Sequence, residues 1–376
     1  MNVIAKTFAG LEQVLADEIQ ELGGENIKIM NRSVSYDADM KLLYSSNYRI
    51  RTALKILVPI SDFYFKNIDE FYDNFYNIEW EKYFKVQKSF FIDSVISSSF
   101  FNNTKFAALK AKDAIVDRFR DKLNTRPSVI TRNPEIKINV YVRENYCNVS
   151  LDSSGEALFK RGYRVNSGPA AINEVLAAGL VKLSGWDGKK ELLDFMCGSG
   201  TIPIEGTMIG LNIPPQIKRK NFGFQHWNDY DKNLWENAVE EANNAQSTNI
   251  ITVFASDISQ RTLDEASENV ANAGLFSYIM LRRASFDKVS FQSPKHIIFN
   301  PPYGKRIGTG NEDIFDFYKR IGDTLKNNFA ESEAWMITSN MQALKNVGLR
   351  TSKKIILYNG PLESRFVKYE MYEGAK

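Results

Sequence analysis

The chain has 376 residues, of which 43% are hydrophobic, 12% aromatic and 25% charged, with 22 glycines and 11 prolines. At about 150 residues per domain this length predicts two to three domains, and the composition excludes collagen-like and largely disordered proteins. No apolar run reaches the roughly 18 residues that a membrane span needs, and the first ten residues do not follow the pattern of a signal peptide. We therefore expect a cytoplasmic protein.

The net charge of +3 is distributed unevenly along the chain. Residues 1–80 hold 8 basic and 12 acidic side chains, residues 81–165 hold 16 and 9, and residues 166–376 hold 24 of each. The basic middle third suits a polyanionic partner, and a solvated surface of mixed charge is the alternative.

Cysteine and histidine are scarce. The chain has Cys147, Cys197, His226 and His296 and no others of either type. These are too few for a disulfide framework or a structural zinc site, so we expect no metal chemistry.

The first 65 residues are predicted to form a small α+β domain. Apolar residues at helical spacing predict a helix over residues 10–23 that ends at the glycine pair that follows. Short alternating stretches predict strands at residues 27–30, 34–36 and 53–60.

A second α+β domain is predicted over residues 66–160. Residues 90–97 read as a strand, and residues 136–151 as a hairpin that turns near Glu144 and Asn145. Between them, residues 104–123 predict a strong helix with six basic residues. The apolar positions of this helix are Phe106, Leu109, Ile115, Phe119 and Leu123.

From residue 161 to residue 376 the pattern changes to alternating helices and strands. Helices are predicted at residues 170–183, 202–210, 260–273 and 314–327, and strands at 192–195, 252–255, 297–299 and 335–338. Residues 211–250 interrupt the alternation with prolines, basic residues and aromatic residues, and read as an insertion with a following helix. Such alternation predicts an open, doubly wound α/β sheet whose ligand site lies at the carboxyl ends of the strands.

A glycine-rich turn follows the first strand of this predicted sheet, in the segment ELLDFMCGSGTIPIE at 191–205. The strand ends at Asp194, and Cys197, Gly198, Ser199 and Gly200 open the next helix. Two glycines allow positive φ angles, and the first free N–H groups of the helix face a ligand. The spacing matches neither the phosphate-binding GxxxxGK[ST] loop nor the dinucleotide GxGxxG loop. We therefore expect the turn to bind a carboxylate or another polar end of a ligand. A tight turn without a ligand is the alternative.

An acidic residue, Asp257, ends the next predicted strand. In this architecture such a side chain accepts two hydrogen bonds from vicinal ribose hydroxyls. Alternatively, Asp257 or Ser259 caps the helix that begins near Gln260.

The segment IIFNPPYGKRI at 297–307 is the most specific signal. Pro301 and Pro302 fix the backbone after the strand and remove two N–H donors. Asn300 adds a side-chain carbonyl and Tyr303 a flat ring, so the loop suits a planar exocyclic amino group. A plain rigid turn is the alternative.

Together, these three motifs resemble those of class I S-adenosylmethionine-dependent amino-methyltransferases, in the order usual for that family. More narrowly, four segments resemble the THUMP-domain RNA guanine-N2 methyltransferases, which include the bacterial 23S rRNA enzymes of the RlmL type. They are FAGLEQVLADEI, LDSSGEALFKRGYRV, GPAAINEVLAAGLVKLSGW and NPPYGKRIG. The resemblance covers essentially the whole chain.

The resemblance implies a ferredoxin-like domain over residues 1–65, an RNA-binding THUMP domain over 66–160 and a Rossmann-like methyltransferase domain over 161–376. It implies S-adenosylmethionine as cofactor, bound by Asp194, Phe195, Cys197, Gly198, Ser199, Gly200, Thr201, Asp257, Ile258, Phe286, Asp287 and Asn300. It also implies a catalytic role for Asn300, Pro301, Pro302 and Tyr303. The sequence departs from the family where an Asp before the NPPY strand meets the adenine amino group, since either Ser285 or Asp287 has that place.

The expected reaction is methyl transfer to the exocyclic N2 of a guanine, with 23S rRNA or a large-subunit precursor as partner. One alternative is methylation of adenine N6 or cytosine N4 in DNA, because an NPPY loop serves any planar amino group. Another is an RNA-binding assembly factor without catalysis. The THUMP resemblance opposes the first alternative, and the intact Gly198, Gly200, Asn300 and Tyr303 oppose the second.

Overall fold

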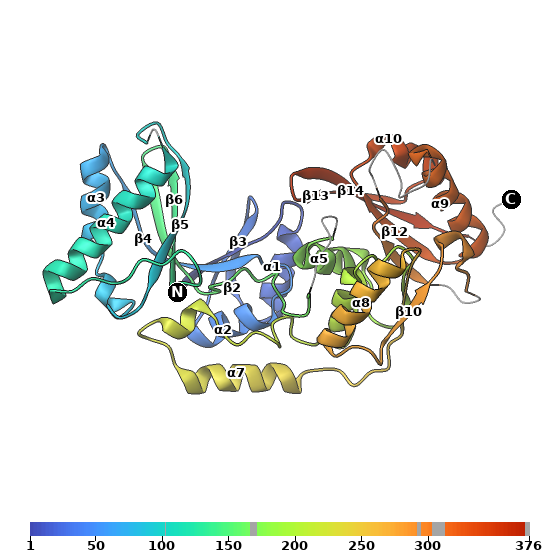
Figure 1. The fold of residues 1–376 in the computed structure, drawn as a ribbon, viewed down its shortest axis with the longest axis horizontal. Coiled ribbons are helices and arrows are strands. Elements are labelled where there is room, and N and C mark those ends of the chain that lie inside the picture. The colour runs from blue at the N-terminus through green and yellow to red at the C-terminus, as the bar shows by residue number, and fades with distance from the viewer. Residues whose placement is uncertain (102, 166–170, 292–294, 303–312, 373–376) are drawn as a thin grey trace. The chain divides into compact units, whose positions relative to one another are not determined.

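The computed structural model describes residues 1–101, 103–165, 171–291, 295–302 and 313–372 (Figure 1). The chain forms two compact units. The first comprises Met1–Lys6, Ala16–Leu158 and Arg219–Glu241, and the second Thr7–Leu15, Phe159–Lys218 and Ala242–Lys376. Each unit is therefore built from segments that are not contiguous in the sequence.

The first unit is organised around one seven-stranded sheet. Its strands are β1 (Asn2–Lys6), β2 (Glu25–Met30), β3 (Ser33–Asp37), β4 (Lys55–Tyr64), β5 (Phe90–Ser97), β6 (Ile136–Arg143) and β7 (Tyr146–Asp152), in the order β2-β3-β1-β4-β7-β6-β5. Strand β4 pairs with β1 on one side and with β7 on the other, and β5 and β6 are parallel. The two predicted α+β domains thus share a sheet through β4. The predicted hairpin is present, with Glu144 in a left-handed conformation at φ 49°.

Helices α1 (Glu12–Glu21), α2 (Met40–Arg49), α3 (Ile68–Asn77) and α4 (Thr104–Leu123) follow in chain order, with a short 3-10 helix at Trp80–Lys82. Helix α4 has the predicted bounds, and its predicted apolar positions Ile115 and Phe119 are buried, at 0% and 1% exposed, but the other predicted apolar positions are not. Small residues of α4, such as Ala107 and Ala111, are fully buried, whereas Phe106 and Leu109 are 41% and 54% exposed. Small side chains let this helix approach the sheet closely. Strand β1 and helices α2 and α3 were not predicted.

The predicted insertion at 211–250 contains a 3-10 helix (Gly223–His226) and α7 (Lys232–Asn244). Its aromatic residues Phe222 and Phe224 are 1% and 0% exposed, and Phe224 lies against Tyr44 of α2 with ring centroids 4.5 Å apart. Arg219 donates hydrogen bonds to the carbonyls of Glu156 and Ala157 at 2.9 and 2.6 Å. These insertion residues therefore build the core of the first unit.

The second unit is the expected doubly wound α/β domain. Its strands are β8 (Leu192–Asp194), β9 (Val253–Asp257), β10 (Ile279–Arg283), β11 (His296–Phe299), β12 (Glu333–Thr338), β13 (Lys353–Asn359) and β14 (Leu362–Glu370), in the order β10-β9-β8-β11-β12-β14-β13. Its helices are α5 (Glu174–Ser184), α6 (Thr201–Gly210), α8 (Gln260–Ala273), α9 (Ile314–Asn328) and α10 (Met341–Leu344), with 3-10 helices at Phe286–Lys288 and Lys345–Val347. Strands β8 to β12 are parallel, and β14 is antiparallel to both of its neighbours. Strand β10 and the hairpin β13–β14 were not predicted.

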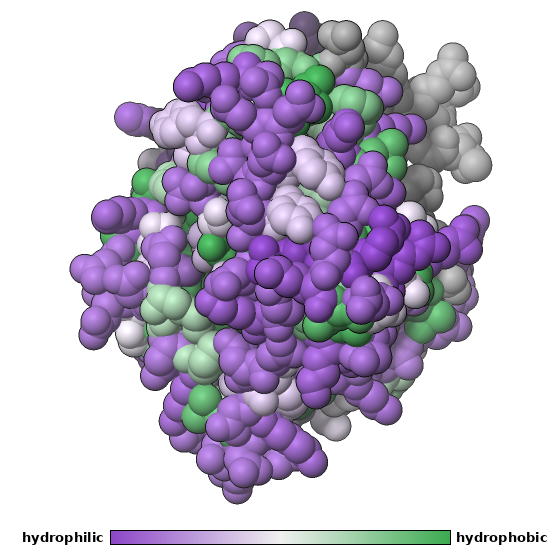
Figure 2. Space-filling model, turned by 90° about the vertical axis from the view of Figure 1, so that its left-hand side faces the viewer, coloured by the Kyte–Doolittle hydropathy of each residue, from purple (hydrophilic) through white to green (hydrophobic). Residues whose placement is uncertain are grey.

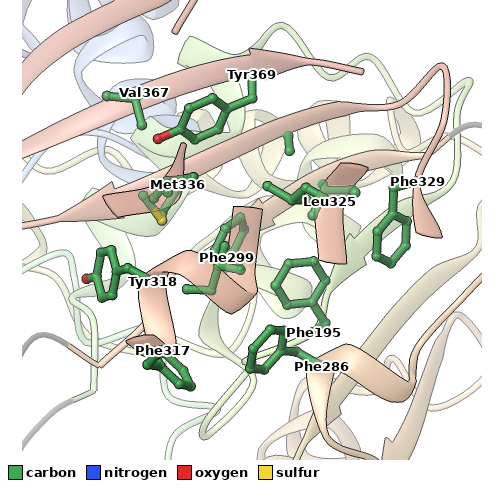
Figure 3. Close-up of a cluster of buried hydrophobic side chains, with 14 of the residues drawn as sticks. Phe195, Phe286, Phe299, Phe317, Tyr318, Leu325, Phe329, Met336, Val367 and Tyr369 are labelled. Carbon is green, nitrogen blue, oxygen red and sulfur yellow. The ribbon is translucent and has the colours of Figure 1, made fainter. Parts of the chain in front are cut away.

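A cluster of buried apolar side chains joins the sheet to α9 (Figure 3). Phe195, directly after β8, is 1% exposed, and its ring centroid lies 4.5 Å from that of Phe299 on β11. Phe286 and Phe329 lie 6.1 and 5.8 Å from Phe195. Because the cluster contains residues at the ends of two neighbouring strands, it fixes the positions of the loops that follow them.

Among the residues that the structure describes, none of the helices has the length and apolar character to cross a membrane. Hydrophilic residues predominate on the face of the molecule in Figure 2, where hydrophobic residues form small separate patches.

Candidate active site

The predicted site residues that the structure describes gather at the carboxyl ends of four parallel strands. Strand β8 lies between β9 and β11, so the strand order changes direction there. Open α/β sheets bind ligands at such a switch point. The glycine-rich turn follows β8, Asp257 ends β9, Ser285 lies shortly after β10 and Asn300 directly follows β11.

The glycine-rich turn has a defined conformation. The Cys197 N–H donates to the Ser256 carbonyl at 3.0 Å, which attaches the turn to the end of β9. Gly198 and Gly200 have φ angles of 52° and 81°. A Cβ at Gly200 would lie 3.3 Å from the Cβ of Ala266, whereas a Cβ at Gly198 would meet nothing within 4 Å. The backbone at Gly198 therefore borders open space, as a ligand-binding turn requires.

Asp257 connects the turn to the second motif. Its Oδ2 accepts a hydrogen bond from the Gly198 N–H at 3.0 Å, and its Oδ1 accepts one from the Ser259 N–H at 2.9 Å. Ser259, and not Asp257, is the N-cap of α8. The adjacent Ile258 is 67% exposed, which leaves an apolar side chain beside the carboxylate.

Burial disfavours the charged forms of two ionisable side chains of the turn. Burial raises the pKa of Asp194 well above its usual range, and the nearby charge of Asp257 adds to this effect. Burial, with the charges of Asp194 and Asp257, also raises the pKa of the Cys197 thiol. A thiol that stays protonated is a poor nucleophile. Cys197 and Asp194, which are 7% and 1% exposed, therefore serve the shape of the turn.

Residues that were not predicted as site residues hold the glycine-rich turn in place through hydrogen bonds. Asn269 on α8 is 1% exposed; its Nδ2 donates to the Ser199 carbonyl at 2.9 Å, and its Oδ1 accepts from the Val165 N–H at 3.1 Å. Arg164 donates to Thr201 Oγ1 at 2.8 Å. The turn is therefore attached to both α8 and the segment that enters this unit.

The same entering segment is anchored to α6. The Tyr163 hydroxyl donates to Glu205 Oε1 at 3.0 Å, and Arg161 Nε lies 3.4 Å from the same oxygen. Arg161 and Glu205 are 2% and 0% exposed. Arg161 and Tyr163 lie in the segment LDSSGEALFKRGYRV, one of those that carry the family resemblance. Their roles could not be predicted from it, because they depend on contacts with a distant helix.

After β11, the structure describes Asn300, Pro301 and Pro302, whereas Tyr303 lies outside the described residues. The Oδ1 atom of Asn300 is buried and accepts no hydrogen bond from the described part of the chain. The Tyr318 hydroxyl of α9 donates to the Pro302 carbonyl at 3.4 Å and lies 2.6 Å from Thr338 Oγ1. Tyr318, which was not predicted as a site residue, thus ties the proline loop to the end of β12.

Residues 284–287 lie at the edge of the site. Phe286 is 5% exposed and packs in the aromatic cluster, as does Phe195, so both predicted cofactor residues have core side chains. Asp287 Oδ2 accepts from Arg320 Nη1 at 2.9 Å, and its Oδ1 is buried without a partner among the described residues. Ser285 precedes the 3-10 helix and makes no capping bond to it with its side chain.

The unsatisfied polar atoms fit a ligand with hydrogen-bond donors. Besides Asn300 Oδ1, the hydroxyl of Ser256 on β9 is buried and has no partner in the described residues. A buried polar group without a partner costs about 1–3 kcal/mol, so a ligand that bonds to such atoms gains affinity from them. Within the described ranges, no three His, Cys, Asp or Glu side chains are grouped so that they could hold a metal ion.

Comparisons with known families match three consecutive parts of the chain. The RlmL ferredoxin-like domain matches residues 2–57, the THUMP domain residues 65–152, and the RMKL-like methyltransferase domain residues 161–368. The chain belongs to the THUMP-containing RlmL-like family of S-adenosylmethionine-dependent RNA methyltransferases. The family resemblance found in the sequence and the expected fold class are thereby confirmed.

Two curated relatives of this methyltransferase family match nearly all of the chain. The protein named "Putative RNA methyltransferase slr0064" of Synechocystis sp. is 34% identical over 370 residues, which are 98% of this chain and 96% of that protein. The ribosomal RNA large subunit methyltransferase K/L of Shewanella sp. strain ANA-3 is 34% identical over 378 residues, 99% of this chain and 53% of that enzyme. This chain therefore spans about half the length of the K/L enzyme.

A solved structure extends the likeness to the cofactor. The crystal structure of SMU.472 in complex with SAH has a TM-score of 0.90 and 26% identity, covering 100% of this chain and 99% of that chain. SAH is S-adenosylhomocysteine, which remains when S-adenosylmethionine has given up its methyl group. S-adenosylmethionine is the cofactor, as the sequence predicted.

Proposed function

We propose that this protein methylates the exocyclic N2 of a guanine in 23S rRNA or its large-subunit precursor, in the cytoplasm. The observation that carries the proposal is the buried carbonyl oxygen of Asn300, which has no hydrogen-bond partner among the described residues. It lies at the end of β11, the strand next to the one that precedes the glycine-rich turn. An acceptor in this position, beside the rigid Pro301 carbonyl, suits an amino group with two N–H donors better than a ring carbon, which has none.

In this proposal the glycine-rich turn and Asp257 bind the cofactor. The open backbone at Gly198 borders the amino-acid end of the cofactor, and Asp257 accepts hydrogen bonds from the ribose hydroxyls while it still holds the Gly198 N–H. The exposed Ile258 packs on the adenine ring. Two residues are candidates for the contact with the adenine amino group. Ser285 makes no capping bond with its side chain, and Asp287 has a buried Oδ1 without a partner among the described residues while Arg320 holds its Oδ2.

S-adenosylmethionine supplies a methyl group that is activated by a positively charged sulfur. Asn300 Oδ1 and the Pro301 carbonyl accept the two amino hydrogens of guanine and so orient its lone pair toward that methyl group. Because these bonds favour a pyramidal nitrogen, they strengthen as the new N–C bond forms, which lowers the barrier. The bond between the methyl group and sulfur breaks at the same time, S-adenosylhomocysteine is the leaving group, and the positively charged amino nitrogen then gives up one proton to water. Orientation supplies much of the remaining acceleration, since the guanine amino nitrogen is a weak nucleophile. Stacking of the base on Tyr303 stays a prediction from the sequence.

The test is a nucleoside analysis by mass spectrometry of 23S rRNA methylated in vitro by the full-length protein, with rRNA from a deletion strain as substrate. N2-methylguanosine is the expected product, and it should form at least tenfold more slowly when Asn300→Ala replaces the wild-type enzyme. A ribose methylation or 5-methylcytosine would contradict the proposal. Methylation of DNA at adenine N6, with no product in RNA, would support the DNA enzyme instead.

A further inference from the structure

On one face of strands β4, β7, β6 and β5 in the first unit, the described side chains Tyr64, Tyr141 and Val95 are exposed, and we refer to this part of the sheet as the helix-free face. It does not include the part of β6 that contacts the 3-10 helix Gly223–His226. Helices α3 and α4 pack on the opposite face, where Phe63 of β4 lies against Phe71 and Phe75 of α3 with ring centroids 6.2 and 5.6 Å apart. Successive side chains of a strand point to opposite faces, so Tyr64 lies on the helix-free face. The register places Tyr64 beside Tyr146 of β7.

Three tyrosines cross this helix-free face, and we refer to Tyr64, Tyr146 and Tyr141 as the tyrosine row. The rings of Tyr64 and Tyr146 lie 5.2 Å apart, and Tyr141 of β6 is diagonal to Tyr146 in the paired strands. Tyr64 is 70% exposed, Tyr141 40%, and the neighbouring Val95 of β5 58%. Flat aromatic rings are thus exposed on three adjacent strands of one sheet.

The charges on this face favour a polyanion. Arg143 pairs with Tyr146, and Lys137 lies further along the same strand and the same face as Arg143; both make no ion pair within the described residues. Three carboxylates also lie on this face: Asp93 pairs with Lys55 at 2.6 Å, Asp152 is buried and interacts with Lys137, and Asp62 lies beside the tyrosine row. Residues 81–165, which include three of the four strands, hold 16 basic and 9 acidic side chains.

We propose that the tyrosine row binds an unpaired stretch of RNA, with bases stacked on the tyrosine rings and phosphates near Arg143 and Lys137. The inference rests on the proposed function, since it takes RNA as the substrate. Exposed aromatic side chains on a sheet, with cations beside them, are the usual means by which proteins bind unpaired bases. A duplex does not fit, because its bases are already stacked inside the helix.

The experiment measures binding of the full-length chain to a fluorescent single-stranded RNA of about ten nucleotides and to a duplex of the same sequence. Tyr64→Ala and Tyr141→Ala should each weaken binding of the single strand by about 5-fold to 150-fold, which is the effect of losing one stacked base. Tyr64→Phe and Tyr141→Phe keep the ring and should bind within twofold of wild type. Tyr76→Ala on α3, the helix side of the same sheet, is the matched control.

The outcomes separate this surface from the proposed function. If the single strand binds equally well to the alanine variants and to wild type while rRNA is still methylated, the tyrosine row is not the RNA site and the function stands. If the alanine variants lose binding but no RNA is methylated by any variant, the RNA surface stands and the proposed reaction fails. The stacking proposal would be overturned if Tyr76→Ala weakened single-strand binding as much as Tyr64→Ala and Tyr141→Ala do. It would also be overturned if these two variants weakened duplex binding as much as single-strand binding.

Discussion

The carboxylate of Asp257 accepts a hydrogen bond from the backbone N–H of Gly198 at 3.0 Å, which joins two motifs 59 residues apart in the chain. The position of the ribose acceptor and the conformation of the glycine-rich turn are therefore coupled. Its other oxygen accepts from the Ser259 N–H, so the side chain is oriented before any ligand arrives. An acceptor that is already oriented loses little conformational entropy on binding.

Replacing Asp257 with alanine should weaken S-adenosylmethionine binding by roughly 1.5–3 kcal/mol, because charge-assisted bonds to the ribose and the support of Gly198 are lost together. Isothermal titration calorimetry on the full-length protein measures this change. Asp264→Ala, which removes the same charge from the exposed side of α8, is the control and should bind as wild type does. Wild-type affinity in Asp257→Ala would disprove the ribose assignment.

Asn269→Ala should loosen the glycine-rich turn without touching the ligand. It removes the bonds to the Ser199 carbonyl and to the Val165 N–H and leaves both groups without these partners. The free energy of unfolding should fall by about 1–3 kcal/mol. The affinity for the cofactor should fall as well, although Asn269 lies below the turn. Urea unfolding measures the stability and calorimetry the cofactor affinity. A loss of stability with unchanged cofactor affinity would show that the turn keeps its shape without the hydrogen bonds of Asn269.

Asn300→Ala should reduce the turnover number at least tenfold, about 1.4 kcal/mol of transition-state stabilisation, while cofactor affinity stays nearly the same. Because Oδ1 has no partner among the described residues, its removal should not lower thermal stability. Asn300→Asp keeps an acceptor oxygen and should retain more activity than the alanine variant. Single-turnover methylation with saturating RNA and thermal melts measure these quantities. Full activity in Asn300→Ala would exclude this residue from the mechanism.

Local patterns in the sequence predicted the elements of the second unit that carry the site. Helix α8 of this unit has the predicted bounds, as does strand β5 of the first unit. The strands before Asp257 and Asn300 were predicted because an apolar run precedes each of these two residues. Strand β1 and helix α2 were missed; β1 has only five residues. Helix α2 has ten residues, as many as the predicted α1, so its length does not explain why it was missed. A strand as short as β1 is stabilised by its pairing in the sheet, which periodicity does not report.

The sequence did not predict which segments of the chain form each of the two units, because this depends on contacts between distant segments. Leu11 belongs with the methyltransferase sheet, since a side chain at Gly179 of α5 would lie 2.6 Å from it. Phe224 belongs with the first unit because it packs on Tyr44. Likewise, nothing in the sequence marked Asn269 or Tyr318 as supports of the site, since each acts through hydrogen bonds to other segments of the chain. The three-domain boundaries stay a prediction.

Asp152 should make the stability of the protein depend on pH. Burial raises the pKa of this carboxyl to about 6, although Lys55 and Lys137 oppose the shift. In the unfolded chain its pKa is about 3.9, so the folded state holds the proton more tightly. The contribution is fully present below pH 4 and is lost as the pH rises to 6, by about 3 kcal/mol in total. Urea unfolding of wild type and Asp152→Asn between pH 4 and 7.5 should give profiles that diverge over this window. Parallel profiles would contradict the assignment.

Tyr318→Phe should lower turnover without weakening cofactor binding. The Tyr318 hydroxyl lies between Thr338 Oγ1, at 2.6 Å, and the carbonyl of Pro302, at 3.4 Å, so it positions the loop that begins with Asn300. The ring stays in the aromatic cluster of Figure 3 when only the hydroxyl is removed. A lost hydrogen bond of about 1 kcal/mol corresponds to roughly a fivefold decrease in the turnover number if the loop position matters in the transition state.

Tyr369→Phe is the matched control for this change, because Tyr369 is 1% exposed and belongs to the same cluster. If the Tyr318 hydroxyl only stabilises the fold, Tyr318→Phe should lower thermal stability as Tyr369→Phe does. The turnover number at saturating RNA should then stay unchanged in both variants. A positioning role lowers the turnover number in Tyr318→Phe alone, with the dissociation constant of S-adenosylmethionine within twofold of wild type. Equal turnover numbers in the two variants would therefore show that the proline loop holds its position without Tyr318.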